Sequence, residues 1–229
     1  MNKVYTSPAS AVADIPDGAT IMVGGFGVTG VPFNLIKALA DKGSKNLTIV
    51  SNSGGGRLPD LDLSLVMKNG QAKKLITTYP VYTDRFTAFE DRFLKGEIEM
   101  EMVPQGTFAE RIRAGGAGIP AFYTPTGAGT KLAEGKEVRV FNGKPHVLEH
   151  ALRADFALIR AHKADTSGNL VYHRAARNFN PVMATAAQIT IVEVAEIVDA
   201  GRLDPEAIVT PAIYVDRIVI GEKHEIRFD

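Results

Sequence analysis

Glycines near the N-terminus have the types and spacing of a phosphate-binding loop. Gly25, Gly27 and Gly30 satisfy the G-x-G-x-x-G pattern, between a predicted strand and a predicted helix that Pro32 opens. Glycine allows a tight turn, and the free N–H groups at a helix start can face a phosphate. A dinucleotide site also needs an acidic residue after the second strand, where residues 51–53 are Ser, Asn and Ser. The segment therefore favours a phosphate-bearing or carbonyl-bearing ligand over NAD.

Two further patterns contain metal-binding residue types. His146, Glu149 and His150 match H-x-x-E-H, which binds zinc where the segment is helical. Residues 143–145 are Gly, Lys and Pro, however, and the sequence downstream offers no third acidic ligand, so ordinary histidines are the better interpretation. In residues 97–103 apolar side chains alternate with three glutamates, as in a strand with one solvated face. We therefore predict no metal site.

Nucleophilic catalysis by a serine or cysteine of this chain has little support. The sequence contains no cysteine and no G-x-S-x-G pattern. Residues 174–180 bring two arginines and two asparagines together before a predicted helix. Guanidinium and amide groups there could bind an anion or a partner, or could hold an irregular loop in place. The sequence leaves both interpretations open.

The composition argues against several functional classes. The 26 Lys and Arg residues balance the 26 Asp and Glu residues, whereas nucleic-acid binding and attachment to a membrane surface both need a basic excess. No apolar run approaches the ~18 residues of a membrane span, and residues 1–18 lack the apolar region of a signal peptide. With 45% apolar residues the chain can fill a normal core. We expect a soluble, cytoplasmic, globular protein.

Short apolar segments alternate with helical patterns along the chain, which is typical of a parallel sheet covered by helices. Thr107 and Glu110 predict a capping box for a helix through Arg113. Asn180 is available to cap a helix over residues 181–187. Residues 115–129 are rich in Gly and Pro and predict a long loop. The predicted strands are residues 20–23, 47–50, 75–79, 97–103, 156–161, 170–172, 189–194 and 213–220.

These elements predict one continuous α/β domain over residues 1–229. We expect an open, mostly parallel sheet with helices on both faces and a small β-rich subregion near residues 124–148. No repeat and no low-complexity linker divides the chain. The helix after Pro32 should bury its apolar positions, which include Leu35, Ile36, Leu39 and Ala40.

Five blocks of sequence are more specific than the glycines alone. The chain resembles the A (alpha) subunit of the 3-oxoacid-type enzymes among the family I coenzyme A transferases. The resemblance covers nearly the whole chain and implies an open α/β fold of the CoA-transferase type. The blocks are residues 17–18 with 21–32, 104–107 with 109–116, 122–127, 176–181 and 210–217.

The resemblance implies an exchange of CoA between two carboxylic acids in two steps. A glutamate attacks the acyl-CoA carbonyl to give an acyl anhydride, and the freed CoA thiolate then forms a glutamyl-CoA thioester. Negative charge builds up on the thioester oxygen, and the resemblance assigns Gln105 as the amide that donates to this oxyanion. CoA is thus a substrate, and no permanently bound cofactor is expected.

The resemblance also assigns binding residues, with two departures from the common oxoacid pattern. Asn52 belongs to the acyl pocket, and Ser53 stands where that pattern has a second Asn. Residues 78–83, which include Tyr79, replace a Ser-Tyr-x-Gly-x-Asn stretch that also flanks the pocket. The residues associated with CoA are Gly24, Gly25, Phe26, Gly27, Val28, Thr29 and Gly30.

The nucleophilic glutamate is expected on another chain. None of the 13 glutamates follows a serine, whereas the family's nucleophile lies in a Ser-Glu-Asn-Gly context on the B subunit. The predicted loop over residues 115–129 could pack against that partner. We expect a heterodimer of A and B chains, doubled into an A2B2 heterotetramer.

The sequence therefore predicts the A subunit of an enzyme that moves CoA between succinyl-CoA or acetyl-CoA and a short 3-oxo acid such as acetoacetate. This is chemistry of ketone-body and fatty-acid metabolism. Tyr79 and Pro80 are nearer to the 3-oxoadipate branch, whereas residues 178–180 are nearer to the oxoacid and acetate branch. Alternatives within the fold are a 3-oxoadipate CoA-transferase, a hydrolase of CoA-linked ring compounds and a non-catalytic sensor of CoA esters. An NAD dehydrogenase and a zinc hydrolase are rivals from other classes.

Overall fold

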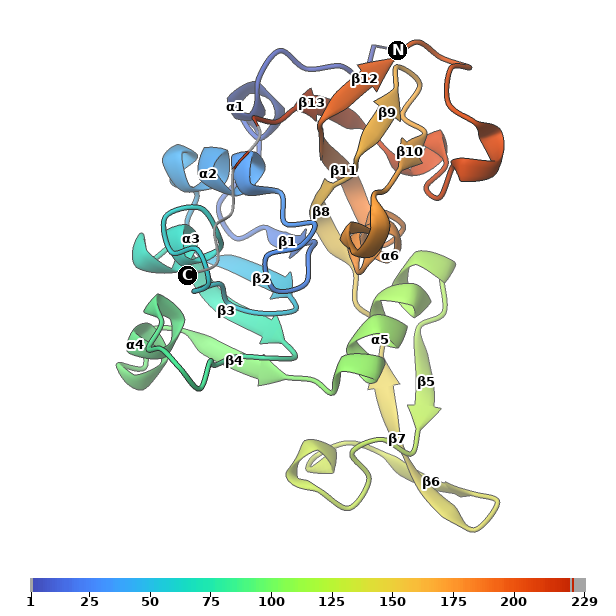
Figure 1. The fold of residues 1–229 in the computed structure, drawn as a ribbon. Helices are drawn as coiled ribbons and strands as arrows, with labels where there is room; N and C mark the ends of the chain where they lie inside the picture. The colour runs from blue at the N-terminus through green and yellow to red at the C-terminus, as the bar shows by residue number, and fades with distance from the viewer. Residues whose placement is uncertain (1, 223, 225–229) are drawn as a thin grey trace.

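A seven-stranded sheet forms the centre of the computed structural model, which describes residues 2–222 and 224 (Figure 1). Its strands are β1 (Thr20–Val23), β2 (Leu47–Ser51), β3 (Ala72–Thr77), β4 (Glu99–Met102), β8 (Ala154–Arg160), β11 (Ala187–Val194) and β13 (Arg217–Ile220). The strand order is β13-β11-β8-β1-β2-β3-β4, and all neighbouring strands are parallel. This confirms the predicted open, parallel sheet.

Helices cover both faces of this sheet, as the sequence predicts. They are α1 (Pro8–Ala11), α2 (Phe33–Lys42), α3 (Ser64–Lys68), α4 (Ala88–Leu94), α5 (Gln105–Ala117) and α6 (Asn180–Ala184). Ile21 and Val23 of β1 belong to one core cluster, with residues of α2, α3 and α4. Met22, between them, belongs to a second cluster, with residues of α5 and α6. Successive side chains of a strand point to opposite faces, so a strand covered on both sides is apolar throughout.

Helix α2 confirms the expectation from its sequence. It begins directly after Pro32 and ends at Lys42. Gly43 follows as the capping residue, and its left-handed backbone (φ +80°) closes the last turn. All four apolar residues named for its inner face are buried. Within residues 2–222 and 224, no helix is long and apolar enough to span a bilayer.

The capping box predicted for α5 is wrong. The helix begins at Gln105, so Thr107 and Glu110 lie inside it, and the N–H of Phe108 donates to the carbonyl of Pro104 at 2.8 Å. Pro104 directly precedes the helix and, with φ −54°, sets the direction of the first turn. Glu110 instead pairs with Arg113 at 2.7 Å on the exposed side of the helix.

The predicted loop over residues 115–129 is also wrong in its first half. Helix α5 continues to Ala117, and β5 (Ala121–Thr124) follows after a short turn. Two of the glycines serve close packing: a Cβ on Gly115 would lie 1.9 Å from the carbonyl oxygen of Leu152. A Cβ on Gly116 would lie 2.3 Å from Oγ1 of Thr185. The helix carries glycines because its last turn touches other chain segments, which the sequence pattern alone does not reveal.

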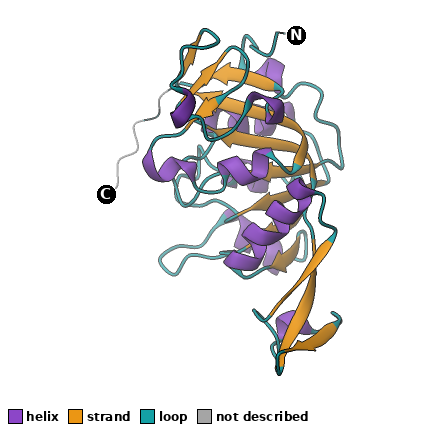
Figure 2. Cartoon of the chain, turned by 90° about the vertical axis from the view of Figure 1, so that its right-hand side faces the viewer, coloured by secondary structure: helices purple, strands orange, loops and turns teal. Residues whose placement is uncertain are grey.

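A small antiparallel sheet forms an arm (residues 121–150) that projects away from the body (Figure 2). It contains β5 with β6 (Val138–Phe141) and β7 (Lys144–His150), in the order β5-β7-β6, which confirms the predicted β-rich subregion. A third sheet contains β9 (Lys163–Asp165), β10 (Leu170–Val171) and β12 (Glu196–Val198). The 3-10 turns are η1 (Lys131–Ala133), η2 (Arg174–Arg177), η3 (Pro205–Ala207) and η4 (Ala212–Tyr214).

Three further expectations about local structure are corrected. Asn180 does not cap α6: it is the first residue of the helix, and its side chain bonds to other segments. The strand predicted over residues 213–220 begins only at Arg217, because η4 occupies its first part. The sequence also predicts that residues 97–103 alternate between a buried apolar face and a solvated face. This is wrong in β4, where the apolar side chain of Met102 is 48% exposed.

A chain of ion pairs joins the arm to the body. Glu101 of β4 accepts from Lys74 and from Arg111 of α5, each at 2.7 Å. Burial raises the pKa of Glu101, but hydrogen bonds from these two cations outweigh it and leave the pKa below its ordinary value. Arg111 also faces the buried Glu149 of β7 at 3.8 Å, and Lys136 completes the chain by donating to Glu149 at 2.6 Å.

Arg111 is the central member of this chain, and Arg111→Met should lower the free energy of unfolding by about 2–4 kcal/mol, because two carboxylates lose a buried cation. The guanidinium also donates to the carbonyl of His150 at 2.7 Å. Urea denaturation measures the effect. Arg113→Met is the matched control on the same helix, since its ion pair is exposed. Equal effects of the two substitutions would contradict the role of the ion-pair chain.

Candidate functional site

Four consecutive strands of the sheet end at residues that carry the candidate site. Strand β1 is followed by Gly24, β2 by Asn52, β3 by Thr78, and β4, after a two-residue connection, by Gln105. Because the strands are parallel, these residues lie along one edge of the sheet (Figure 1). The carboxyl edge of an open parallel sheet is where α/β proteins bind their ligands. The topology therefore brings residues together that lie far apart in the sequence.

The amide of Asn52 organises this edge. Its Oδ1 accepts from Oγ1 of Thr78 at 2.8 Å and from Nε2 of Gln105 at 2.7 Å. Its backbone carbonyl accepts from Oγ1 of Thr77 and from the N–H of Tyr79. Asn52 is 5% exposed, and the two hydrogen bonds to its Oδ1 hold the side-chain amide in one orientation. Its NH2 group has no hydrogen-bond partner among the described residues, so it is free to donate to a ligand.

Gln105 lies at a helix start, two residues before the helix start that the capping box at Thr107 predicted. It is the first residue of α5 and is exposed. No side chain caps the N-terminus of α5, so its first N–H groups and the positive end of the helix dipole lie beside Gln105. This environment favours negative charge next to the Gln105 amide.

A crevice between two loops joins the two groups of predicted site residues. The glycine segment lines one side with Gly24, Gly25 and Gly27, and residues 51–53 line the other. The crevice is narrow, with a volume of about 20 Å³. Part of the segment assigned to CoA thus lies beside Asn52 and Ser53 of the residues assigned to the acyl pocket, whereas Tyr79 does not line the crevice.

The glycine segment is held by the asparagines of residues 174–180. The Nδ2 groups of Asn178 and Asn180 donate to the carbonyls of Thr29 and Gly30, each at 3.0 Å. A Cβ on Gly24 would lie 1.9 Å from Oδ1 of Asn180, and one on Gly30 would meet the same side chain. The sequence left open whether this cluster binds a ligand or holds an irregular loop in place. The two asparagines hold the loop, whereas the two arginines of the cluster are exposed.

Within the segment, Phe26 and Thr29 form a tight hairpin through two backbone hydrogen bonds of 3.0 Å. Gly27 and Val28 form its tip. Phe26 is 50% exposed, so the hairpin presents an aromatic ring to solvent at the rim of the crevice.

The helix that follows the glycines does not offer an anion site. The N–H groups of Asn34 and Leu35, in the first turn of α2, both donate to the carboxylate of Glu193. Glu193 is 1% exposed, and burial raises its pKa above the ordinary value, opposed by hydrogen bonds from Asn34 and by the charge of Arg160. An internal carboxylate thus occupies the place where a dinucleotide phosphate would bind. This argues against NAD.

Comparison with known proteins identifies the family. A family model described as "Coenzyme A transferase" matches residues 5–221. The chain belongs to the coenzyme A transferase family. It is 51% identical to the A subunit of a probable succinyl-CoA:3-ketoacid coenzyme A transferase of Bacillus subtilis over 229 residues, which are 100% of this chain and 94% of that protein. It is also 51% identical to the A subunit of the 3-oxoadipate CoA-transferase of Pseudomonas putida over 219 residues, with 96% and 94% coverage.

A solved structure also matches. An acyl-CoA transferase from Escherichia coli O157:H7, solved as a thioester complex with CoA, superimposes with a TM-score of 0.81 at 25% identity. The match covers 96% of this chain and 47% of that longer chain. The coenzyme A transferase fold is therefore shown over nearly the whole molecule.

The aromatic side of the candidate site involves both segments that depart from the oxoacid pattern. Ser53 and Tyr79 form an isolated bridge between the loops after β2 and β3. Oγ of Ser53 accepts from the hydroxyl of Tyr82 at 3.4 Å, and the rings of Tyr79 and Tyr82 meet edge to face at 5.5 Å. Tyr79 is 47% exposed, so it forms part of an open wall.

The H-x-x-E-H residues do not have zinc-binding geometry. They lie on β7, a strand, where His146 and His150 are four residues and about 13 Å apart. Glu149 is engaged in the ion-pair chain of the arm. Among the described residues, no group of three His, Cys, Asp or Glu side chains could hold a metal ion.

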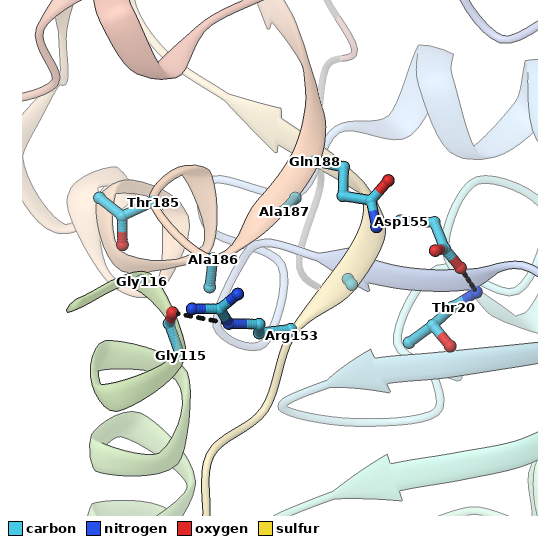
Figure 3. Close-up of a pocket in the computed structure, with 10 residues that line it drawn as sticks. Thr20, Gly115, Gly116, Arg153, Asp155, Thr185, Ala186, Ala187 and Gln188 are labelled. Atoms are coloured by element: carbon cyan, nitrogen blue, oxygen red, sulfur yellow. Dashed lines mark hydrogen bonds between the residues drawn. The ribbon is translucent and has the colours of Figure 1, made fainter. Parts of the chain in front are cut away.

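A second hollow, of about 370 Å³, lies at the opposite end of the sheet, where β1, β8 and β11 begin (Figure 3). Asp155 accepts from the N–H of Thr20 at 2.8 Å, and Nε of Arg153 donates to the carbonyl of Gly115 at 3.1 Å. These contacts hold the backbone, and the edge is the amino edge of the sheet. The carboxyl edge is therefore the better site.

The sequence analysis placed residues 78–83 beside the pocket but named only Tyr79 among them, so it assigned no role to two residues that the structure links to the candidate site. Thr78 links Asn52 to Gln105, and Tyr82 links Ser53 to the aromatic wall. The signal for Thr78 was its position directly after β3, which mirrors that of Asn52 after β2. No sequence signal distinguishes Tyr82 from the tyrosines around it.

Gly24→Ala should lower the free energy of unfolding by about 1–3 kcal/mol or more, because its Cβ would overlap the side chain of Asn180. Chemical denaturation measures this. Gly106→Ala is the matched control: its helical backbone leaves open space for a Cβ, so stability should stay equal or rise by up to about 1 kcal/mol. If the Gly24→Ala variant is as stable as Gly106→Ala, the close packing of Gly24 against the side chain of Asn180 is contradicted.

Proposed function

We propose that this chain is the A subunit of a 3-oxoacid CoA-transferase that moves CoA between succinyl-CoA or acetyl-CoA and a short 3-oxo acid such as acetoacetate. The observation that carries the proposal is the Gln105–Asn52 amide pair at the carboxyl edge, beside the glycine segment. The name of the relative from Bacillus subtilis supports the same reaction. The reaction belongs to ketone-body and fatty-acid metabolism.

The first half-reaction begins with a carboxylate of the partner B subunit. Its oxygen attacks the thioester carbon of the acyl-CoA, the carbonyl electrons move onto oxygen, and the CoA thiolate leaves as the acyl anhydride forms. The thiolate then attacks the glutamyl carbonyl of the anhydride. This step releases the acid as a carboxylate and leaves CoA on the glutamate as a thioester. A second acid reverses both steps and takes CoA.

Gln105 is the group of this chain that acts in each addition. Its NH2 group donates to Asn52 at 2.7 Å, which fixes the amide, and makes a longer contact of 3.4 Å with Oγ1 of Thr78, which an oxyanion can replace as acceptor. The N-terminus of α5 adds positive potential at the same place. A donor fixed before the reaction is worth ~3 kcal/mol of barrier, because it does not reorganise as charge develops.

The glycine segment and its neighbours complete the site. The residues from Gly24 to Gly30 bind CoA, and Asn52, Ser53 and Tyr79 line the acyl pocket. Gly27 lies exposed at the tip of the hairpin, with no atom near the position of a Cβ, so a ligand can approach the backbone there. The free NH2 group of Asn52 is placed to donate to the acyl group.

The assembly we propose is an A2B2 heterotetramer in the cytoplasm. The arm supports a partner, since it exposes Val138, Val140 and Phe141 by 43–68% and is too thin to cover them itself. The Escherichia coli chain, of which this chain covers 47%, carries a further half in the same polypeptide. A separate B subunit would supply that half here.

A 3-oxoadipate CoA-transferase is the second candidate. Its support is the pair Tyr79 and Pro80 beside Ser53, together with the 51% identity to the Pseudomonas putida protein. Assays with acetoacetate and 3-oxoadipate distinguish the two. Net release of free CoA from a ring substrate would instead favour a hydrolase, and binding of a CoA ester without turnover would favour a sensor.

Gln105→Ala should lower kcat of the two-subunit enzyme by about 10²-fold or more, because the oxyanion loses its donor. Acyl exchange between succinyl-CoA and acetoacetate measures the rate, and thermal melting checks that the fold persists.

Gln188→Ala is the matched control, since Gln188 is an exposed glutamine at the opposite edge of the sheet. Its kcat should equal that of the wild type. An unchanged kcat with a lowered melting temperature for Gln105→Ala would make Gln105 a structural residue only.

The isolated chain should have no transferase activity, because its glutamates lack the sequence context of the nucleophile. Expression of this chain alone and together with its B subunit, followed by the same exchange assay, tests this. Turnover by the isolated chain, or a borohydride-trapped thioester on one of its own glutamates, would contradict the requirement for a partner.

A further inference from the structure

The loops beside the acyl pocket carry two arginines that the reaction as described does not use. Arg57 follows the three glycines after β2, and Arg85 lies in the segment after β3. Both pair with the carboxylate of Asp84, at 3.1 and 3.0 Å. The buried carboxylate of Asp62 also acts on Arg85, so the two guanidinium groups are balanced by two carboxylates. A guanidinium that keeps N–H groups free can still bind a carboxylate of a ligand.

Arg57 is the member of the cluster that is built toward the pocket. Its guanidinium lies over the ring of Tyr82, 4.6 Å from the centroid. The hydroxyl of that tyrosine donates to Ser53, the residue next to Asn52. A single phenol ring therefore separates the guanidinium from the acyl pocket, and Tyr82, which is 8% exposed, fixes the direction of the arginine.

The backbone of Arg57 is also fixed. The N–H groups on either side of it, of Gly56 and Leu58, both donate to one oxygen of Asp62 at 2.8 Å. Asp62 is 5% exposed and receives a third bond from the N–H of Ser64. The loop is thus anchored by a buried carboxylate, and the arginine side chain leaves it from a defined position.

Arg57 has two nitrogens without a hydrogen-bond partner among the described residues, whereas each of the three nitrogens of Arg85 makes a hydrogen bond. Arg85 directs Nε and Nη2 to Asp84 and Nη1 to the carbonyl of Gly56. Arg57 donates to Asp84 through Nη1 alone. Within the described part of the chain, Nε and Nη2 of Arg57 have no hydrogen-bond partner, so the edge of the guanidinium that these two nitrogens form remains for the oxygens of a ligand.

We infer that Arg57 is a specificity-determining residue that binds the second carboxylate of a dicarboxylic substrate. Resting on the function proposed above, this inference favours the succinyl donor over acetyl-CoA, and favours 3-oxo acids that end in a carboxylate. The carbonyl that reacts lies at Gln105 and Asn52, and the far end of the acyl chain extends past Ser53 to the guanidinium. Acetoacetate, which ends in a methyl group, gains nothing from Arg57.

The test compares matched acids in the two-subunit enzyme. We measure kcat/KM for 3-oxoadipate against acetoacetate, and for succinate against acetate, in wild type, Arg57→Gln and Arg85→Gln. Arg57→Gln should lower the dicarboxylate-to-monocarboxylate ratio by about tenfold or more, since a charged hydrogen bond is lost from one class only. Arg57→Lys, which keeps the charge, should recover part of the ratio and should fold even where the glutamine variant does not.

Arg85→Gln is the control for a general loss of positive charge, because it removes a guanidinium of equal exposure from the same cluster. Its ratio should stay within about threefold of wild type, since a screened exposed charge acts weakly at a distance. An unchanged ratio in Arg57→Gln, or equal shifts in both variants, would overturn the role of Arg57 and leave the proposed function intact. Absence of CoA exchange with all four acids in wild type would overturn the proposed function, and the inference with it.

Discussion

The side-chain amide of Asn180 holds together the parts of the molecule on which the site depends. Its Nδ2 donates to the carbonyls of Gly30 and Ala176, and its Oδ1 accepts from the N–H of Arg160 at the end of β8. Asn180 is fully buried, and an unpaired amide there would be costly, so each bond constrains a segment. The glycines of the crevice follow from this, because Gly24 and Gly30 approach the amide too closely to carry a side chain.

Buried carboxylates perform a similar task in the loops around the site. Glu193 holds the first turn of α2, Asp62 holds the loop before α3, and Glu149 receives the cations that attach the arm. Each is surrounded by N–H groups or paired with cations, so its negative charge is satisfied within the chain. The groups left to face a ligand are amides, hydroxyls and the exposed guanidinium of Arg57. Such a surface suits a carbonyl whose oxygen gains charge during reaction, together with a carboxylate at the other end of the acyl group.

The site is rigid on one side and open on the other. Asn52, Thr78 and Gln105 come from the ends of three adjacent strands and bond to one another, so their positions are set by the sheet. The aromatic wall around Tyr79 is partly exposed, and the arm, which projects away from the body (Figure 2), carries exposed apolar side chains. A partner chain that brings a carboxylate nucleophile would close the open side. The chain thus has the features of half of an active site, with the donors on this half.

The sequence alone was sufficient to predict the sheet class, helix α2 and the coenzyme A transferase family. Those features follow from local periodicity, from Pro and Gly at helix boundaries, and from a pattern shared with a family. It was insufficient at residues 115–117, at Asn180 and at Glu193, where a glycine, an amide and a carboxylate serve contacts with distant segments. Asn180 and Gly30 are 150 residues apart, and Glu193 and Asn34 are 159 apart. Local propensity carries no information about such pairs, so only the tertiary structure decided that the asparagines hold the glycine loop, that Glu193 occupies the helix start, and that Arg57 lies over the ring of Tyr82.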